Sequence, residues 1–204
     1  MVNEASSRSS ARSLILCALT GVFRVLTSPF VLFYWMTGQR ESVFQSIMQT
    51  AALVPGVLGA LTRQALLTAL AQRCGLRVTV HLGTLFSTPA VEIGENVYIG
   101  AFCNVGYALI DDFVLLGSNV HVLSGRNQHG YARRDLPMAL QAGRKVPVKI
   151  GYGAWIGNGA IVMADIGEQC IVGAGSVVVD PVPAWSVAVG SPARVVADRR
   201  EQES

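Results

Sequence analysis

The chain has 204 residues, of which 51% are hydrophobic and 14% are charged, and its formal net charge at pH 7 is +3. That length accommodates one full core and an additional segment. The small net charge, without a basic run interleaved with aromatic residues, argues against nucleic acid as a partner.

The N-terminal third is predicted to be helical and is strongly apolar. Residues 13–36 contain one charged residue, Arg24, in a run long enough to cross a bilayer as one helix. A charge near the midpoint costs on the order of 3 kcal/mol in hydrocarbon, and Pro29 is expected to break the run into two pieces too short to cross. Residues 13–37 are therefore expected to contact a membrane as a re-entrant or surface-lying helical pair. The alternative is burial at a subunit interface.

Two features favour a cytoplasmic protein, at the cytoplasmic face of the membrane. Arg8 and Arg12 precede the apolar run as in a secretion signal, but no small-x-small cleavage site follows. The four cysteines contain no C-x-x-C pair, which indicates free thiols in a reducing compartment.

A second helical stretch is expected from residue 41 to residue 74. Pro55 suits the first turn of a new helix, and Gly75 suits a C-terminal cap. Its expected apolar stripe consists of Leu58, Leu61, Ala65 and Ala69. Residues 1–75 are thus assigned to an N-terminal helical region.

The rest of the chain has a six-residue aliphatic period. The positions are Ile93, Ile99, Val105, Ile110, Leu116, Val122, Ile150, Ile156, Val162, Ile166, Val172 and Val178. A fixed hexapeptide period predicts a parallel β-helix with the aliphatic residues stacked inside, whereas a sandwich would show turns every 8–12 residues. Glycine follows most of these positions and is expected to turn the corners through unusual backbone angles. The β-helix is assigned to residues 76–195, a polar tail to 196–204, and the preceding helices are expected to cap its open end.

The period is absent from residues 123–147. A long excursion from a rigid repeat is usually functional, so this loop is the expected place for chemistry.

The segment 91–195 resembles the hexapeptide-repeat acetyltransferases. The resemblance lies in the motifs Ala154-Trp-Ile-Gly157, Val172-Gly-Ala-Gly-Ser176 and Val189-Gly-Ser-Pro-Ala-Arg194, which are similar to the maltose, galactoside and polysaccharide O-acetyltransferase branch. It implies a mainly β fold, a left-handed parallel β-helix with an N-terminal α-helical region, a homotrimer, and acetyl-CoA as co-substrate.

The resemblance implies that His129 in the loop is the general base for direct acetyl transfer to a hydroxyl. A histidine can take the hydroxyl proton near neutral pH, and the hydroxyl is a poor nucleophile until it does. Asn127, Tyr131 and His121 are candidate acceptor-binding residues. The candidate coenzyme-binding residues are Trp155, Asn158, Ala174 and Arg194.

The chain departs from the family pattern at one place that is expected to contact the nucleotide part of the coenzyme. Relatives place Thr-Lys after the Gly-Ala-Gly-Ser coil, where this chain has Val179-Asp180. Arg194, Arg199 or Arg200 is expected to compensate, or coenzyme affinity is modest.

The predicted function is O-acetylation of a glycan or lipid-linked sugar. A soluble acetyltransferase for a sugar, amino acid or drug and a non-catalytic scaffold remain alternatives. A γ-type carbonic anhydrase shares this fold, but its histidine spacing would pair His121 with Arg126, so no metal is expected.

Overall fold

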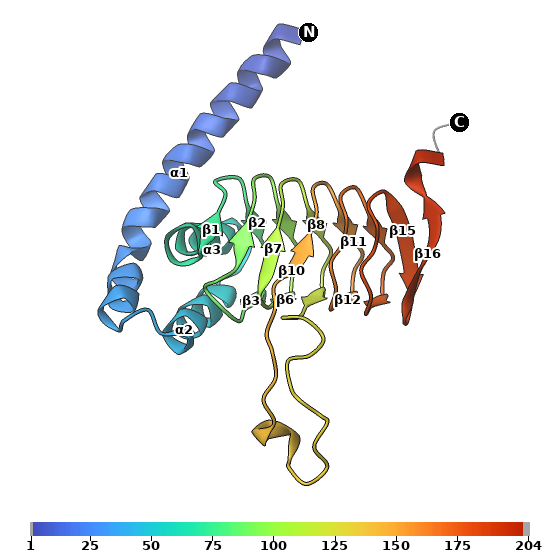
Figure 1. Ribbon diagram of the computed structural model, residues 1–204. Coiled ribbons are helices and arrows are strands. Elements are labelled where there is room, and N and C mark those ends of the chain that lie inside the picture. Colours follow the sequence, from blue (N-terminus) through green and yellow to red (C-terminus); the bar gives the residue numbers. More distant parts are fainter. Residues whose placement is uncertain (1, 202–204) are drawn as a thin grey trace.

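The computed structural model describes residues 2–201, with side chains from residue 19 onward. Three N-terminal helices precede a parallel β-solenoid of about six turns (Figure 1). The predicted mainly β fold, a parallel β-helix with an N-terminal helical region, is confirmed. The side chains of residues 13–18 of the apolar run, and residues 202–204 of the tail, lie outside the described part.

Three flat sheets form the sides of the solenoid. The first contains β1 (Arg73–Cys74), β4 (Glu92–Ile93), β7 (Ala108–Ile110) and β10 (Val148–Ile150). The second contains β2 (Thr79–Val80), β5 (Tyr98–Ile99), β8 (Leu115–Leu116), β11 (Trp155–Ile156), β13 (Ile171–Val172), β15 (Ser186–Gly190) and β16 (Ala193–Asp198). The third contains β3 (Leu85–Phe86), β6 (Asn104–Val105), β9 (His121–Val122), β12 (Ile161–Val162) and β14 (Val177–Val178). Pairing is parallel except between β15 and β16, and the 3-10 helix η2 (Arg199–Glu201) follows β16.

The predicted inward positions form the core. Every one of the hexad aliphatic residues has at most 2% of its surface exposed, and in-register pairing stacks each on its equivalent one turn away, as Ile99 stacks on Leu116. The small residues two places earlier, such as Ala154 and Cys170, are also fully buried. Two-residue strands therefore suffice, because burial and pairing are repeated in every turn.

The glycines after the inward residues are required by space, so the expected reason for them was wrong. A Cβ at Gly100 would lie 2.6 Å from the Gly117 carbonyl carbon in the next turn, and a Cβ at Gly157 would lie 2.5 Å from Ala174 N. The left-handed backbone angles fall two residues later, as at Phe102 (φ 57°) and Gly159 (φ 70°). Close contact between turns, not an unusual φ, excludes a side chain at the glycines.

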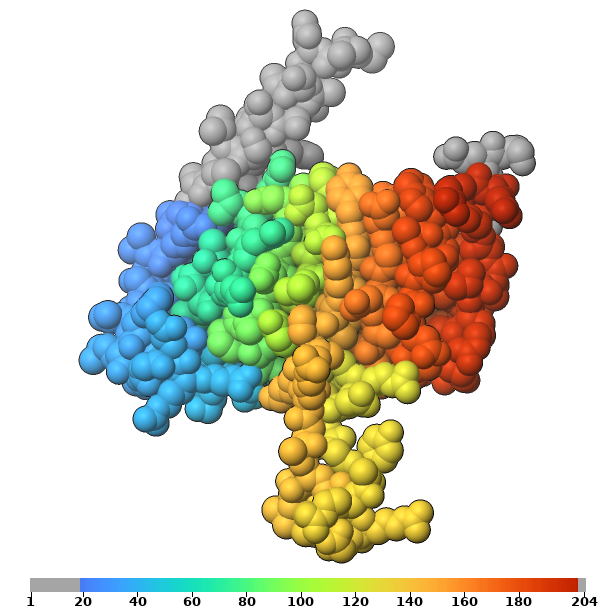
Figure 2. Space-filling model, viewed as in Figure 1, coloured from blue at the N-terminus to red at the C-terminus, as the bar shows by residue number. Residues whose placement is uncertain are grey.

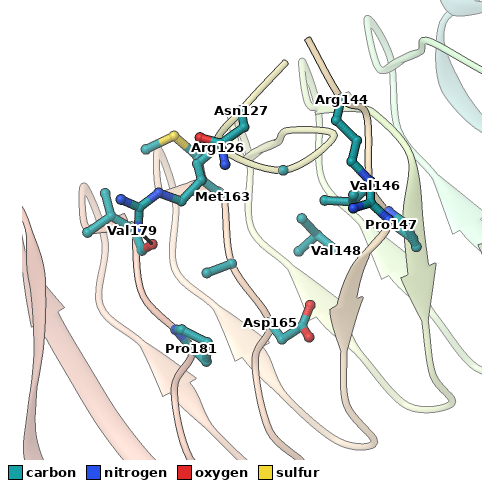
Figure 3. Close-up of a pocket in the computed structure, with 12 residues that line it drawn as sticks. Arg126, Asn127, Arg144, Val146, Pro147, Val148, Met163, Asp165, Val179 and Pro181 are labelled. Atoms are coloured by element: carbon teal, nitrogen blue, oxygen red, sulfur yellow. Dashed lines mark hydrogen bonds between the residues drawn. The ribbon is translucent and has the colours of Figure 1, made fainter. Parts of the chain in front are cut away.

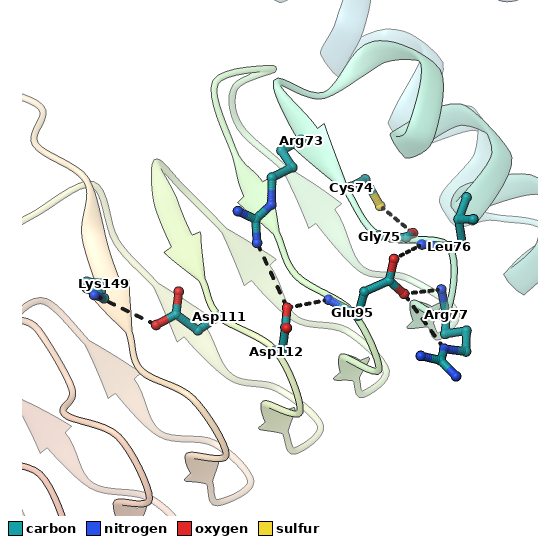
Figure 4. Close-up of polar contacts among 9 residues, drawn as sticks. All are labelled: Arg73, Cys74, Gly75, Leu76, Arg77, Glu95, Asp111, Asp112 and Lys149. Atoms are coloured by element: carbon teal, nitrogen blue, oxygen red, sulfur yellow. Dashed lines mark hydrogen bonds and ion pairs between the residues drawn. The ribbon is translucent and has the colours of Figure 1, made fainter.

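Polar side chains at one corner tie successive turns together (Figure 4). Asp112 Oδ1 accepts a hydrogen bond from Glu95 N at 2.8 Å, and Glu95 in turn accepts from Leu76 N and Arg77 N at 3.1 and 3.2 Å. Lys149 pairs with Asp111 at 3.8 Å on the same side. These bonds satisfy turn N–H groups that the short strands leave unpaired.

The first helix, α1 (Val2–Met36), is continuous, so the expected break at Pro29 was wrong. Proline cannot donate to the carbonyl four residues earlier, but Ser28 Oγ donates to that Val25 carbonyl at 2.7 Å. A side-chain hydroxyl thus replaces the lost backbone bond and lets the helix continue.

One face of α1 packs against α3 (Gly56–Leu70). Thr20, Thr27 and Tyr34, spaced by seven, are at most 8% exposed. The apolar residues on the remaining faces are exposed: Val22, Val25, Leu26, Phe30, Leu32, Phe33, Trp35 and Met36.

Helix α2 (Glu41–Ala52) and α3 close the N-terminal end of the solenoid. Phe44 and Met48 of α2 and Leu67 of α3 join the same buried cluster as Val80 of the first turn. Pro55 precedes the first residue of α3, close to its expected place.

Two details of this region were predicted wrongly. Helix α3 ends at Leu70, and Gly75 follows β1 instead of capping the helix. Leu58 and Ala69 are exposed, whereas Leu61 and Ala65 are buried. The packed face is centred on a charged residue, Arg63, which an apolar stripe does not include.

Arg63 has no exposed surface. Its Nε donates to Val80 O at 2.9 Å, and its Nη1 donates to Ala51 O and Val54 O, each at 2.8 Å. Burial lowers the pKa of its guanidinium. Arg63 therefore satisfies carbonyls at the end of α2 and links both helices to the first turn.

Candidate functional site

The loop between β9 and β10 has an ordered base. Val146 N donates to Ser124 O at 3.1 Å and Arg144 N donates to Asn127 O at 2.8 Å, so the outgoing and returning chains run side by side. Beyond this base the loop, which includes the 3-10 helix η1 (Met138–Leu140), projects away from the solenoid (Figure 1). The yellow and orange segment in Figure 2 stands clear of the molecular body.

His129 lies exposed on the outgoing chain of this loop, opposite Gly143. A Cβ at Gly143 would lie 2.6 Å from His129 Cα and 2.0 Å from Gln128 O, so only glycine permits this approach. Asn127 lies at the base of the same chain, and Tyr131 is 74% exposed farther out. His121 is half-buried on the outer side of β9, just before the loop.

The structure places two candidate coenzyme-binding residues, Asn158 and Ala174, at one corner, and a third, Trp155, on the strand that leads into it. Gly175 N donates to Asn158 O at 2.8 Å, which places Asn158 and Ala174 in adjacent turns. Asn158 Oδ1 also accepts from Ser118 N at 3.0 Å. Trp155, three residues before Asn158, points outward from β11 and is 52% exposed. Among the described residues, no hydrogen bond or ion pair joins His129 to this corner.

The fourth candidate, Arg194, lies on β16 near Asp180. Its Nη1 is 3.9 Å from Asp180 Oδ2, and Arg126 of the loop base is 3.3 Å from Asp180 Oδ1. Asp180, the residue that departs from the family pattern, thus joins the loop base to the C-terminal hairpin. All three side chains are exposed, so each pair contributes little to stability.

The other two arginines expected to compensate are also engaged. Arg199 Nη1 donates to Gln169 Oε1 at 3.1 Å, and Arg200 forms an ion pair with Asp198. The neighbouring guanidinium holds the pKa of Asp198 down to about 2.

A cavity of about 350 Å³ lies at the loop base (Figure 3). Arg126 and Arg144 flank it, and Met163, Asp165 and Pro181 of later turns line it. The sequence did not single out Arg144, Met163 and Asp165, because the returning loop meets the segment after β12 only in the folded chain and no local motif links them.

Within the part of the chain that the structure describes, no group of three or more His, Cys, Asp or Glu side chains could hold a metal ion. His81 packs on Tyr98 with ring centroids 5.0 Å apart. The described residues contain one helix segment long and apolar enough to cross a membrane, Leu19–Met36, of which 11% is buried.

The known proteins that resemble this chain in sequence and in structure point to one family. No family model matches the chain. Nodulation protein L of Rhizobium leguminosarum bv. viciae is 37% identical over 137 residues, covering 61% of this chain and 70% of that protein. The maltose O-acetyltransferase of Clostridium difficile 630 has a similar structure, with a TM-score of 0.68, 25% identity, and coverage of 80% of this chain and 88% of that one. A galactoside acetyltransferase solved in complex with coenzyme A shares the fold, with a TM-score of 0.62, 20% identity, and coverage of 78% and 80%.

The chain spans about half the length of other curated relatives that it matches, which are named acetyltransferases. These similarities, together with the solenoid and its hexapeptide motifs, show that the chain belongs to the hexapeptide-repeat acetyltransferases, in the branch that contains the maltose and galactoside O-acetyltransferases.

Proposed function

We propose that this protein transfers an acetyl group from acetyl-CoA to a hydroxyl of a sugar or glycan. The observation that carries the proposal is the loop 123–147, which leaves the solenoid between β9 and β10 and holds an exposed histidine on an ordered base. A non-catalytic scaffold would need neither the loop nor the histidine.

In this proposal His129 acts as the general base. Its imidazole takes the proton of the acceptor hydroxyl while the oxygen attacks the thioester carbonyl. The new C–O bond forms, the C–S bond breaks, and the imidazolium returns the proton to the departing thiolate. No acyl-enzyme is required, because both substrates are held at once.

The coenzyme is proposed to lie against Trp155, Asn158 and Ala174, with Arg194 toward its phosphates. All three side chains are exposed, Asn158 and Ala174 in adjacent turns and Trp155 on the outer side of β11 just before Asn158. The complex of a galactoside acetyltransferase with coenzyme A supports a coenzyme of this type. Since Asp180 already lies near Arg194, we expect modest affinity for the nucleotide end.

His129→Ala tests the base directly. It should lower kcat by about 10²–10⁴-fold, the usual contribution of a positioned base, and leave acetyl-CoA binding near normal. His121→Ala is the control and should have a much smaller effect. The reverse order would assign the base to His121 and overturn the role of the loop.

We also propose a homotrimer with sites between neighbouring chains. The loop projects from its own chain, so a second copy is needed to enclose His129. The outer face of the second sheet presents an apolar ladder of Tyr98, Leu115 and Trp155, between 40 and 52% exposed. Threefold packing of such a face is a closed symmetric assembly. Light scattering that shows an active, stable monomer would contradict the shared site.

Residues 13–37 are proposed to contact the cytoplasmic face of a membrane, where the acceptor is a lipid-linked sugar or glycan. The exposed apolar residues of α1 on the faces away from α3 support this. Deletion of residues 1–38 should release the protein from membranes and leave the solenoid folded. Because the deletion also uncovers α3, the double variant Leu26→Asn/Phe33→Asn changes only exposed positions and keeps the Thr20–Tyr34 face. A wild-type protein that is soluble without detergent would favour the soluble small-molecule enzyme instead.

A further inference from the structure

The loop 123–147 concentrates positive charge. It contains the basic residues Arg126, Arg133, Arg134, Arg144 and Lys145 and one acidic residue, Asp135, a net of +4. The whole chain has a net of +3, so the remainder is slightly negative. A segment of one sign on an otherwise balanced chain attracts anions to its surroundings.

Only part of this charge is neutralised within the chain. Arg133 pairs with Asp135, and Arg126 pairs with Asp180 at 3.3 Å. Arg134, Arg144 and Lys145 are exposed and form no ion pair with any residue that the structure describes.

Of these three unpaired cations, Arg144 is the one that the contacts between the outgoing and returning chains of the loop connect to His129. Its backbone N–H binds Asn127 O, and its neighbour Gly143 lies against His129. Arg144 also lines the cavity at the loop base, on the side opposite Arg126 (Figure 3).

One carboxylate shares this cavity. Asp165 Oδ1 accepts a hydrogen bond from Lys149 N at 2.8 Å, which holds it on the solenoid. Arg126 is engaged by Asp180, whereas no described residue forms an ion pair or side-chain hydrogen bond with the Arg144 guanidinium at the rim of the cavity. A guanidinium binds carboxylate and phosphate oxygens in pairs, which fixes the orientation of the group it holds.

We propose that the acceptor is anionic, and that its carboxylate or phosphate binds Arg144 while a nearby hydroxyl faces His129. This inference rests on the proposed function and narrows the acceptor class. Arg134 and Lys145 add attraction at longer range, which steers an anionic acceptor toward the loop.

The test uses full-length protein and three acceptors: p-nitrophenyl β-glucoside as the neutral one, glucose 1-phosphate as an anionic one that keeps the primary hydroxyl, and p-nitrophenyl β-glucuronide, whose carboxylate replaces that hydroxyl. The anionic acceptors should have the higher kcat/KM, and added salt should reduce this preference. Arg144→Gln should lower the ratio of anionic to neutral kcat/KM about tenfold, mainly through KM, because a charge-assisted hydrogen bond to the anion is lost. Arg40→Gln, an exposed charge outside the loop, is the control and should not change the ratio.

Two results would overturn the proposal. One is a preference for the neutral acceptor in the wild type; the other is an Arg144→Gln effect on the KM for acetyl-CoA alone, which would assign Arg144 to the phosphates of the donor. Calorimetric binding of glucose 1-phosphate or the glucuronide without acetyl-CoA separates this inference from the proposed function. Binding that depends on Arg144 without any acetyl transfer would refute the proposed function and leave the anion site standing. If neither anionic compound shows binding that depends on Arg144, the proposed anion site is refuted.

Discussion

Replacing Gly157 by alanine separates two explanations for glycine in the turns. The added Cβ would lie 2.5 Å from Ala174 N and 2.9 Å from Ala174 Cα, and these backbone atoms cannot rotate away. Gly159 presents the opposite situation, since a Cβ there meets nothing within 4 Å but its φ is +70°. The first substitution tests space, and the second tests backbone angle.

The magnitudes follow from these geometries. Overpacking ordinarily costs about 1–3 kcal/mol, and we expect the upper end at Gly157 because paired turns on both sides hold the contact in register. Alanine at Gly159 should cost about 1–2 kcal/mol, the usual price of a left-handed conformation. At about 2–4 °C per kcal/mol, the melting temperature should fall by about 6–12 °C for Gly157→Ala and by about 2–8 °C for Gly159→Ala.

Circular dichroism during urea and thermal unfolding measures both values, at one protein concentration so that any association is held constant. Gly159→Asn is a further control, because asparagine tolerates the left-handed region and should cost less than alanine. If Gly157→Ala proves no more destabilising than Gly159→Ala, contact between turns is not what requires these glycines.

Three further predictions concern other regions. Arg63→Met should lower the free energy of unfolding by about 3 kcal/mol, because three buried carbonyls lose a charged donor; Arg63→Lys should lose less, and equal losses in urea titrations would contradict the multiple-donor role. Leu115→Glu should reduce the oligomer mass seen by light scattering, while Leu109→Glu, outward in the same turn on another sheet, should not; unchanged mass in both would exclude the apolar ladder as an interface. Burial raises the pKa of the Cys74 thiol to about 12, so the unfolded chain ionises first, and stability present below about pH 9 is lost as the pH rises toward 12. Cys74→Ala should flatten that decline in urea midpoints measured from pH 8 to 10.5, and an unchanged slope would show that the thiol is not the titrating group.

Part of the site was predictable because it is encoded locally. The aliphatic period places Ile156 inside the solenoid and therefore Trp155 outside it, and the break in the period marks the loop with His129. The cavity was not predictable, since Arg144 meets Met163 and Asp165, which follow β12, only when the long loop returns to the solenoid. Likewise, Asp180 is visible in the sequence as a departure, but its contacts with Arg126 and Arg194 depend on where β16 folds back.

The sequence alone determined the β-helix, because a hexapeptide period repeats one local instruction in every turn and stacking makes the repeats reinforce each other. The features outside the repeat, in the N-terminal helices, were decided by tertiary structure. Helix α1 continues through Pro29 because the Ser28 hydroxyl donates to the Val25 carbonyl, which proline cannot do. Helix α3 places Arg63 inward because its guanidinium donates to the carbonyls of Ala51, Val54 and Val80 there. The glycines belong to both levels: their spacing is written in the sequence, but the reason for them, a neighbouring backbone 2.5 Å from where a Cβ would lie at Gly157, exists only between turns.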